Sequence, residues 1–143
     1  MKTSRFFIYG TEDLESGFLG QTREKTKAAL KKGVDGVIFI DEAYNLASNS
    51  LYGDHDYGKQ IVDVLLRFSV EQFGRTIIVL AGYENKMREF LRTNPGLESR
   101  FSHAVHFRDF SAKECTEILR RQLEKGNAIS DEALVLAESL FEE

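Results

Sequence analysis

Two adjacent carboxylates, Asp41 and Glu42, stand directly after the apolar run Val37–Ile40. Because two neighbouring negative charges repel each other, such a pair favours a cation or a proton close by. A short, continuous apolar run is typical of a strand in a parallel sheet. Acidic residues at the carboxyl end of that strand lie in the crevice where open α/β sheets bind ligands. The pair is therefore the first candidate for chemistry in this chain.

The order of the two carboxylates fits a division of labour known from nucleotide hydrolysis. The first carboxylate helps to hold Mg²⁺, usually through the water shell of the ion, and the second orients or deprotonates the attacking water. This is the Walker B pattern, an apolar run followed by Asp-Glu. The alternative is a strand end followed by a solvated Asp-Glu turn, and the motif alone does not separate the two.

The segments around the pair alternate between strand and helix patterns. Continuous apolar runs at 6–9, 37–40 and 76–81 predict strands that are buried on both faces of a parallel sheet. A helix pattern over 22–32 ends at Gly33. A second helix between the later strands has one apolar stripe, whose members are Ile61, Val64, Leu65 and Phe68. This alternation predicts an α/β fold.

The last third of the chain is more helical. A helix carrying Met87 and Phe90 ends at Asn94-Pro95-Gly96, and residues 104–107 predict a weak last strand. Ser111 stands three residues before Glu114, which is the spacing of a capping box at a helix start. A final helix is expected to begin at Ser130.

Composition excludes several classes of partner and place. The formal net charge is -4 with no block of Lys and Arg, which argues against direct nucleic-acid binding. The single cysteine, Cys115, cannot form an internal disulfide and suits a reducing compartment. The apolar run near the start is too short for a signal peptide or a membrane span. We expect a protein of the cytoplasm or of an organelle stroma or matrix, neither secreted nor membrane-bound.

Five sequence blocks occur together in one order: GVIFIDEAYNL, DYGKQIVDVLLRF, IIVLAGYENKMREFL, NPGLESRF and HFRDFS. In this respect the chain resembles the CbxX/CfqX family of AAA+ ATPases, which includes CbbX-type rubisco activases and stage V sporulation protein K. The resemblance covers about residues 5–123. It implies a partial AAA+ P-loop module, with an α/β core over 1–110 and the beginning of a helical lid over 111–143.

One expected element of that module is missing from the sequence. A P-loop ATPase holds phosphates with a GxxxxGK[ST] loop, and no such string occurs in these 143 residues. The resemblance implies that the chain begins after the first strand, the P-loop and the first helix. We therefore expect negligible ATP binding and hydrolysis by the isolated chain.

The resemblance also assigns the candidate catalytic and nucleotide-binding residues. Asp41 is expected to meet Mg²⁺ through water, and Glu42 to act on the attacking water. Arg100 matches the arginine finger that reaches the nucleotide of a neighbouring subunit. The alternative for Arg100 is an ion pair with Glu98 or Asp109, and Glu98 departs from the family, which often has a basic residue there.

The resemblance also implies a pore loop and a sensor residue, for which the residue types alone give weaker support. Phe18, Leu19 and Gly20 match the pore loop with which AAA+ rings grip a polypeptide, and the alternative is a core phenylalanine that anchors the loop. Tyr83 falls near the sensor position, where its hydroxyl would contact a phosphate or water, and a packing role is the alternative.

The implied function is that of an AAA+ ATPase fragment. The intact module would couple binding and hydrolysis of ATP, with Mg²⁺, to remodelling of a protein client through a hexameric pore, in a homo- or hetero-oligomer of AAA+ subunits. Two alternatives stay open. In the first alternative, the chain is a non-catalytic regulatory subunit that docks with intact relatives and offers them Arg100. In the second, it is a decayed interaction domain.

Overall fold

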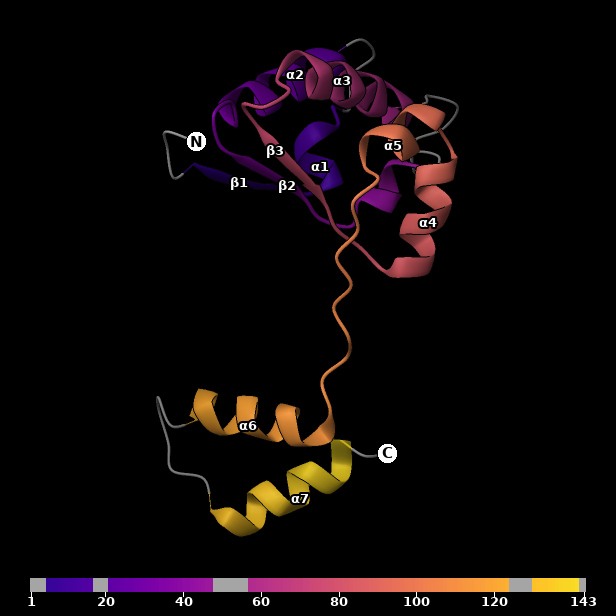
Figure 1. Ribbon diagram of the computed structural model, residues 1–143. Helices are drawn as coiled ribbons and strands as arrows, with labels where there is room; N and C mark the ends of the chain where they lie inside the picture. Colours follow the sequence, from indigo (N-terminus) through magenta and orange to yellow (C-terminus); the bar gives the residue numbers. More distant parts are fainter. Residues whose placement is uncertain (1–4, 17–20, 48–56, 124–129, 142–143) are drawn as a thin grey trace. The chain divides into compact units, whose positions relative to one another are not determined.

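The computed structural model describes residues 5–16, 21–47, 57–123 and 130–141 of the chain (Figure 1). It divides into two compact units, Met1–Ala104 and Val105–Glu143. The first unit contains a sheet with flanking helices, and the second contains two helices.

Three parallel strands form the sheet of the first unit: β1 (Phe6–Tyr9), β2 (Val37–Ile40) and β3 (Ile77–Leu80). They lie in the order β1-β2-β3, so β2 is central. The register aligns Tyr9, Ile40 and Leu80, the last residues of the three strands. The predicted parallel α/β sheet is thus confirmed, and Asp41 leaves it from the middle strand.

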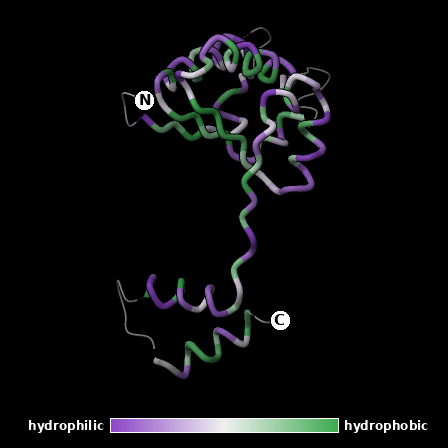
Figure 2. The backbone as a smooth tube through the Cα atoms, in the orientation of Figure 1, coloured by the Kyte–Doolittle hydropathy of each residue, from purple (hydrophilic) through white to green (hydrophobic). Residues whose placement is uncertain are grey.

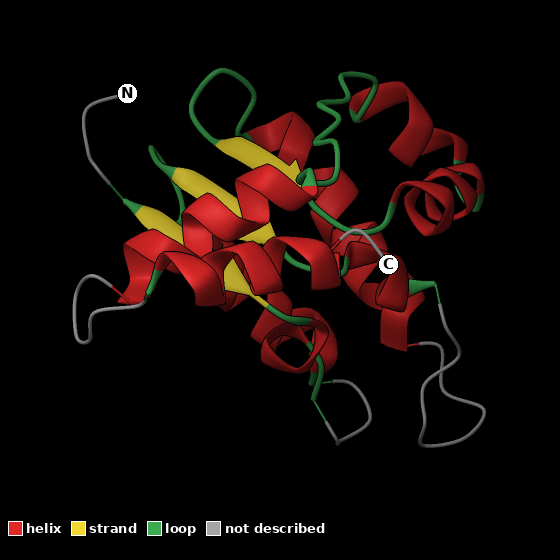
Figure 3. Ribbon diagram, turned by 90° about the horizontal axis from the view of Figure 1, so that it is seen from below, coloured by secondary structure: helices red, strands yellow, loops and turns green. Residues whose placement is uncertain are grey.

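Helices cover one face of this sheet (Figures 1 and 3). The short α1 (Thr11–Leu14) follows β1, and α2 (Thr22–Lys32) and α3 (Tyr57–Glu71) pack side by side above the strands. The core between the layers consists of fully buried side chains from α2, β2 and α3, among them Leu30, Ile38, Ile40, Ile61 and Leu65. All four members of the predicted stripe on α3 are buried. The helices predicted over 22–32 and between the later two strands are thus confirmed as α2 and α3.

The other face of the sheet is apolar but uncovered in the part of the chain that the structure describes. Alternate strand residues point to it, and Phe6, Ile8 and Ile77 are 56, 64 and 51% exposed. Hydrophobic residues run through the strands without interruption (Figure 2). The prediction that these strands are buried on both faces is therefore wrong, because a continuous apolar run provides two apolar faces but not a second covering layer.

A pair of helices follows β3 in the first unit: α4 (Glu84–Arg92) and α5 (Pro95–Arg100). The predicted helix end at Asn94-Pro95-Gly96 is also a helix start. The Asn94 side chain accepts a hydrogen bond of 2.8 Å from the Gly96 N–H. Pro95 occupies the first turn of α5, where a backbone N–H has no partner within the helix, so its missing N–H costs nothing. The sequence patterns did not predict α5, which places Arg100 at a helix end.

The predicted strand at 104–107 is wrong. Residues 101–111 contain no helix or strand, and Val105 and Phe107 are 80 and 92% exposed. Apolar residues form a strand only where a neighbouring strand supplies hydrogen-bond partners, and no described strand pairs with this segment.

The second unit consists of α6 (Ala112–Leu123) and α7 (Asp131–Phe141), which contact each other. The predicted capping box is present. The Ser111 N–H donates to Glu114 Oε2 over 2.9 Å, and the Glu114 N–H donates to Ser111 Oγ over 3.4 Å. Ser130 caps α7 as expected, with its Oγ accepting the Ala133 N–H at 3.3 Å. None of the described helices combines the length and apolarity needed to cross a membrane.

Candidate functional site

Asp41 and Glu42 lie where the central strand ends, and both side chains are exposed. The Asp41 N–H donates to Tyr9 O, and the Ala43 N–H donates to Ala81 O, each over 3.0 Å. These bonds continue the sheet pattern one step beyond β2 toward both neighbouring strands. The carboxylate pair is therefore held between the carboxyl ends of β1 and β3, at the edge where open α/β sheets bind ligands.

Glu42 has a left-handed backbone conformation, with φ 46° and ψ 42°. For a residue other than glycine this conformation costs roughly 1–2 kcal/mol, and such outliers cluster at functional sites. The Glu42 N–H donates to Asp41 Oδ1 over 3.0 Å and supports the turn. The turn leads directly into the short 3₁₀ helix η1 (Ala43–Leu46).

Both oxygens of the Glu42 carboxylate accept hydrogen bonds from η1. The Tyr44 hydroxyl donates to Oε1 over 2.8 Å, and Asn45 Nδ2 donates to Oε2 over 3.2 Å. The hydrogen bond to Glu42, together with desolvation, raises the pKa of Tyr44 to about 12. Tyr44 and Asn45 were not among the residues expected at the site, although the polar side chains two and three residues after Glu42 were a usable signal.

Tyr83 adjoins this group from the end of β3. It is the N-cap residue of α4 and is 70% exposed. Its ring centroid lies 6.3 Å from that of Tyr44, and Lys86 Nζ lies 4.6 Å from the Tyr44 centroid and 5.5 Å from that of Tyr83. The structure thus brings Tyr83 to the ring that binds Glu42, and its contact with a phosphate stays a prediction.

The donor set at the strand end fits a magnesium ion that is shared with a substrate. Mg²⁺ is commonly bound by one or two carboxylates, several waters and substrate phosphates. Asp41 offers one exposed carboxylate, and the described residues contain no group of three or more His, Cys, Asp or Glu side chains that could hold a metal. Phosphate oxygens and water would have to complete the shell, as expected for a water-mediated Asp41.

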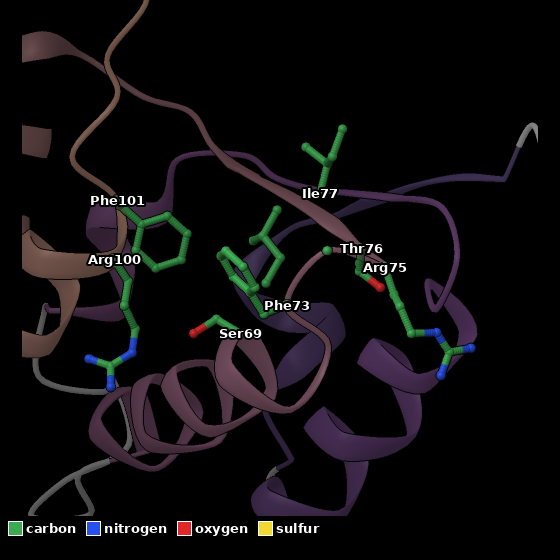
Figure 4. Close-up of a pocket in the computed structure, with 9 residues that line it drawn as sticks. Ser69, Phe73, Arg75, Thr76, Ile77, Arg100 and Phe101 are labelled. Atoms are coloured by element: carbon green, nitrogen blue, oxygen red, sulfur yellow. The ribbon is translucent and has the colours of Figure 1, made fainter. Parts of the chain in front are cut away.

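Arg100 lies apart from the two carboxylates. It lines a pocket of about 400 Å³ at the amino end of β3, together with Ser69, Phe73, Ile77 and Phe101 (Figure 4). Its Nη1 donates to Gly96 O over 3.2 Å, and it makes no ion pair with Glu98 among the described residues. Figure 4 shows Arg75, by contrast, pointing away from the pocket. The structure therefore does not bring Arg100 and Glu42 into one site within a single chain.

The same pocket adjoins the outer edge of β3. In the described part of the chain this strand pairs with β2 alone. Thr76 Oγ1, just before the strand, is buried without a hydrogen-bond partner. The edge of β3 and the uncovered sheet face beside it are thus places where a further strand and helix would find partners.

The expected pore loop, Phe18, Leu19 and Gly20, lies outside the described residues.

Comparisons with known proteins agree with the α/β fold. The model of the ATPase family associated with various cellular activities (AAA) matches residues 2–109. Stage V sporulation protein K of Bacillus subtilis is 39% identical over 122 residues, which are 85% of this chain and 37% of that protein. Protein CbbX of Cereibacter sphaeroides is 37% identical over 116 residues, which are 81% of this chain and 37% of that protein.

Protein CfxQ of Xanthobacter flavus is 38% identical over 109 residues, which are 76% of this chain and 34% of that protein. The chain thus spans little more than a third of the length of these relatives. The family model nevertheless covers most of the chain, including all three strands and the carboxylate pair. This chain belongs to the AAA family of ATPases.

Proposed function

We propose that this chain supplies the Walker B part of an ATP-hydrolysing AAA site. Asp41 contacts Mg²⁺ bound to ATP through water, and Glu42 acts on the attacking water. The observation that carries the proposal is the exposed Asp41–Glu42 pair at the carboxyl end of the central strand, between β1 and β3. When bound, Mg²⁺ neutralises charge on the phosphates, and the chain contributes the carboxylates that orient the ion's water shell and the nucleophile.

The phosphate-binding loop reaches this site on a segment outside the 143 residues, which contain no GxxxxGK[ST] string. Two features support this part of the proposal. In the described part of the chain, the edge of β3 that faces away from β2 is unpaired. In the same part of the chain, the apolar sheet face carrying Phe6, Ile8 and Ile77 is uncovered. A strand that pairs with β3 and a helix that covers this face would satisfy both.

Arg100 acts on the nucleotide of a neighbouring subunit in this proposal. It is exposed, it makes no ion pair among the described residues, and it lies at the opposite end of β3 from the carboxylates. A guanidinium in that situation is suited to neutralise phosphate charge across a subunit interface. Assembly into a ring, and the remodelling of a protein client that Phe18 would grip, are the further parts of the proposal.

A regulatory role is the second candidate. The exposed Arg100 and the lack of a GxxxxGK[ST] string in the 143 residues both favour it. A chain that offers Arg100 but contains no phosphate-binding string could stimulate a complete relative without hydrolysing ATP itself. In that case Arg100→Ala would abolish stimulation of the relative, whereas Glu42→Gln would leave it unchanged.

The experiment compares the chain alone with a fusion. In the fusion, a strand, a GxxxxGK[ST] loop and a helix precede residue 1 of the full 143-residue chain. Calorimetry with ATP and Mg²⁺ is expected to show no binding to the chain alone and clear binding to the fusion. Glu42→Gln in the fusion should keep ATP binding and lower kcat about 100-fold or more, the usual effect of losing a general base.

Glu89→Gln is the matched control, because Glu89 is an exposed glutamate on α4 outside the site. It should leave both binding and kcat unchanged. Hydrolysis by the fusion that survives Glu42→Gln would overturn the assignment of Glu42. Tight ATP binding by the chain alone would overturn the need for an added phosphate-binding loop.

A further inference from the structure

The Glu42 carboxylate is held at both oxygens by groups that lie only two and three residues further along the chain. Tyr44 donates to Oε1 and Asn45 donates to Oε2, at 2.8 and 3.2 Å. A free glutamate side chain samples many rotamers because it has three rotatable bonds. Two donors on one short turn remove most of that freedom and leave one orientation of the carboxylate.

Gly82, which follows the end of β3, leaves room for the Tyr44 ring. A Cβ placed on Gly82 would lie 2.7 Å from Tyr44 Cδ1 and 2.8 Å from Cε1, closer than such atoms approach. Glycine at this position therefore lets the ring lie against the segment that follows β3. Lys86 Nζ, 4.6 Å from the ring centroid, adds a favourable cation contact.

We propose that Tyr44 is a positioning residue for Glu42, with Asn45 as its second support and Gly82 as the residue that makes space for the ring. This inference rests on the proposed function, in which Glu42 acts on the attacking water. Tyr44 itself is not required to touch the nucleotide. It sets the direction in which the Glu42 carboxylate presents its remaining lone pairs.

The expected effect is on the rate of the chemical step. A general base works when it is held within a fraction of an ångström of its productive position, and partners that hold a catalytic ligand typically contribute about 10–100-fold to activity. Nucleotide affinity depends on the phosphate-binding loop and on Mg²⁺ instead. Loss of the Tyr44 hydroxyl should thus lower kcat and leave the Kd for ATP unchanged.

The contact can be measured in the 143-residue chain without any nucleotide. Tetranitromethane nitrates tyrosine through its phenolate, so a phenol that donates a hydrogen bond to a carboxylate, and thereby keeps its proton, reacts slowly. Mass spectrometry after nitration at pH 8 should show Tyr44 modified about 10-fold or more slowly than Tyr83, the exposed internal reference. In Glu42→Ala and in Gly82→Ala, Tyr44 should react at a rate close to that of Tyr83.

The kinetic experiment uses the fusion described above. Tyr44→Phe should lower kcat about 10-fold with an unchanged Kd for ATP. Tyr9→Phe is the matched control, because it also removes a hydroxyl hydrogen bond, of 2.9 Å to Ala29 O, but not one to Glu42. Circular dichroism checks that each variant is folded, and Gly82→Ala should lower kcat as Tyr44→Phe does although it substitutes neither Glu42 nor Tyr44, because the added Cβ displaces the Tyr44 ring.

The two proposals fail in different ways. If Glu42→Gln abolishes hydrolysis while Tyr44→Phe and Gly82→Ala leave kcat unchanged or raise it, the positioning role is wrong and the proposed function stands. If Tyr44 is nitrated as fast as Tyr83 in the unmodified chain, the contact itself is absent and the inference falls. If the fusion shows no hydrolysis that depends on Glu42, the proposed function is wrong and the inference falls with it.

Discussion

Arg75 donates two hydrogen bonds to the carboxylate of Asp35, from Nε over 2.9 Å and from Nη2 over 2.8 Å, across forty residues of sequence. Asp35 lies in the turn before β2, and Arg75 in the turn before β3. The pair therefore ties together the amino ends of two neighbouring strands. Planar, two-point pairing of this kind is specific to arginine, since lysine offers a single compact charge.

Arg75→Lys and Arg75→Gln should each lower the melting temperature slightly, by about 1–4 °C, because both partners are exposed to solvent. The hydrogen bonds from Arg75 lower the pKa of Asp35 below its usual 3.8. The stabilisation is thus present above pH 3.8 and is lost as the pH falls through the lowered pKa. Urea midpoints of the variants should converge on that of the unmodified chain as the pH falls below this lowered pKa, and a difference that persists in strong acid would contradict this account.

Subunit mixing tests where Arg100 acts. Arg100 lies at the other end of β3 from Glu42, so one chain does not bring the two residues together. In the fusion, Glu42→Gln and Arg100→Ala should each lower ATP hydrolysis strongly. When the two variants are mixed, some interfaces pair an intact Glu42 with an intact Arg100 of the neighbour, and part of the activity should return.

The control for mixing is the double variant, which carries both substitutions in one chain. Mixed with either single variant it creates no intact pair, so no activity should return. If the Arg100→Ala fusion keeps full activity, or if mixing restores nothing, Arg100 does not act between subunits.

Acid should loosen the start of α6 before the rest of that helix. Arg108 donates to Glu114 over 2.8 Å, and Ser111 donates to the same carboxylate, which together hold the pKa of Glu114 at about 2. A lowered carboxyl pKa contributes stability above its ordinary value of 4.5, and this is lost as the pH falls toward 2. Amides in the first turn of α6 should lose protection over that range, where protection compares the measured exchange rate with the intrinsic rate at the same pH, because intrinsic exchange itself slows in acid.

Glu114→Gln should show this lower protection already at pH 7 and little further change in protection on acidification, because the glutamine side-chain amide does not titrate. Glu132→Gln, on α7, is the control and should behave like the unmodified chain. Equal acid sensitivity in Glu114→Gln would mean that another group governs the end of this helix.

Local sequence patterns were sufficient for most of the elements. The stripe on α3, the end of α2 at Gly33 and the capping box of α6 depend on residues within a few positions of each other, so the sequence alone reveals them. The segment 104–107 failed because a strand depends on a distant partner, and no local pattern reports whether that partner is present. The covered and uncovered faces of the sheet were indistinguishable for the same reason.

The site was predicted in part on the same grounds. Asp41 and Glu42 could be placed because the end of a strand is a local feature. The hydrogen bond from Tyr44 depends on the left-handed backbone of Glu42 and on the space left by Gly82, which lies forty residues from Glu42. Such a relationship between separate strand ends appears only when the fold is known.

The two faces of the sheet should respond differently to the same substitution. Ile38 is fully buried under α2 and α3, whereas Ile8 is 64% exposed on the uncovered face. Ile38→Thr removes apolar contacts and buries a hydroxyl, which should lower the free energy of unfolding by about 2–4 kcal/mol. Ile8→Thr keeps a β-branched residue on a solvated face and should change it by less than about 0.5 kcal/mol. Urea unfolding of the isolated chain measures both.

In the fusion, a covering segment would bury Ile8, so Ile8→Thr should become clearly destabilising there. If Ile8→Thr stays neutral in the fusion, the added strand and helix do not pack on this face.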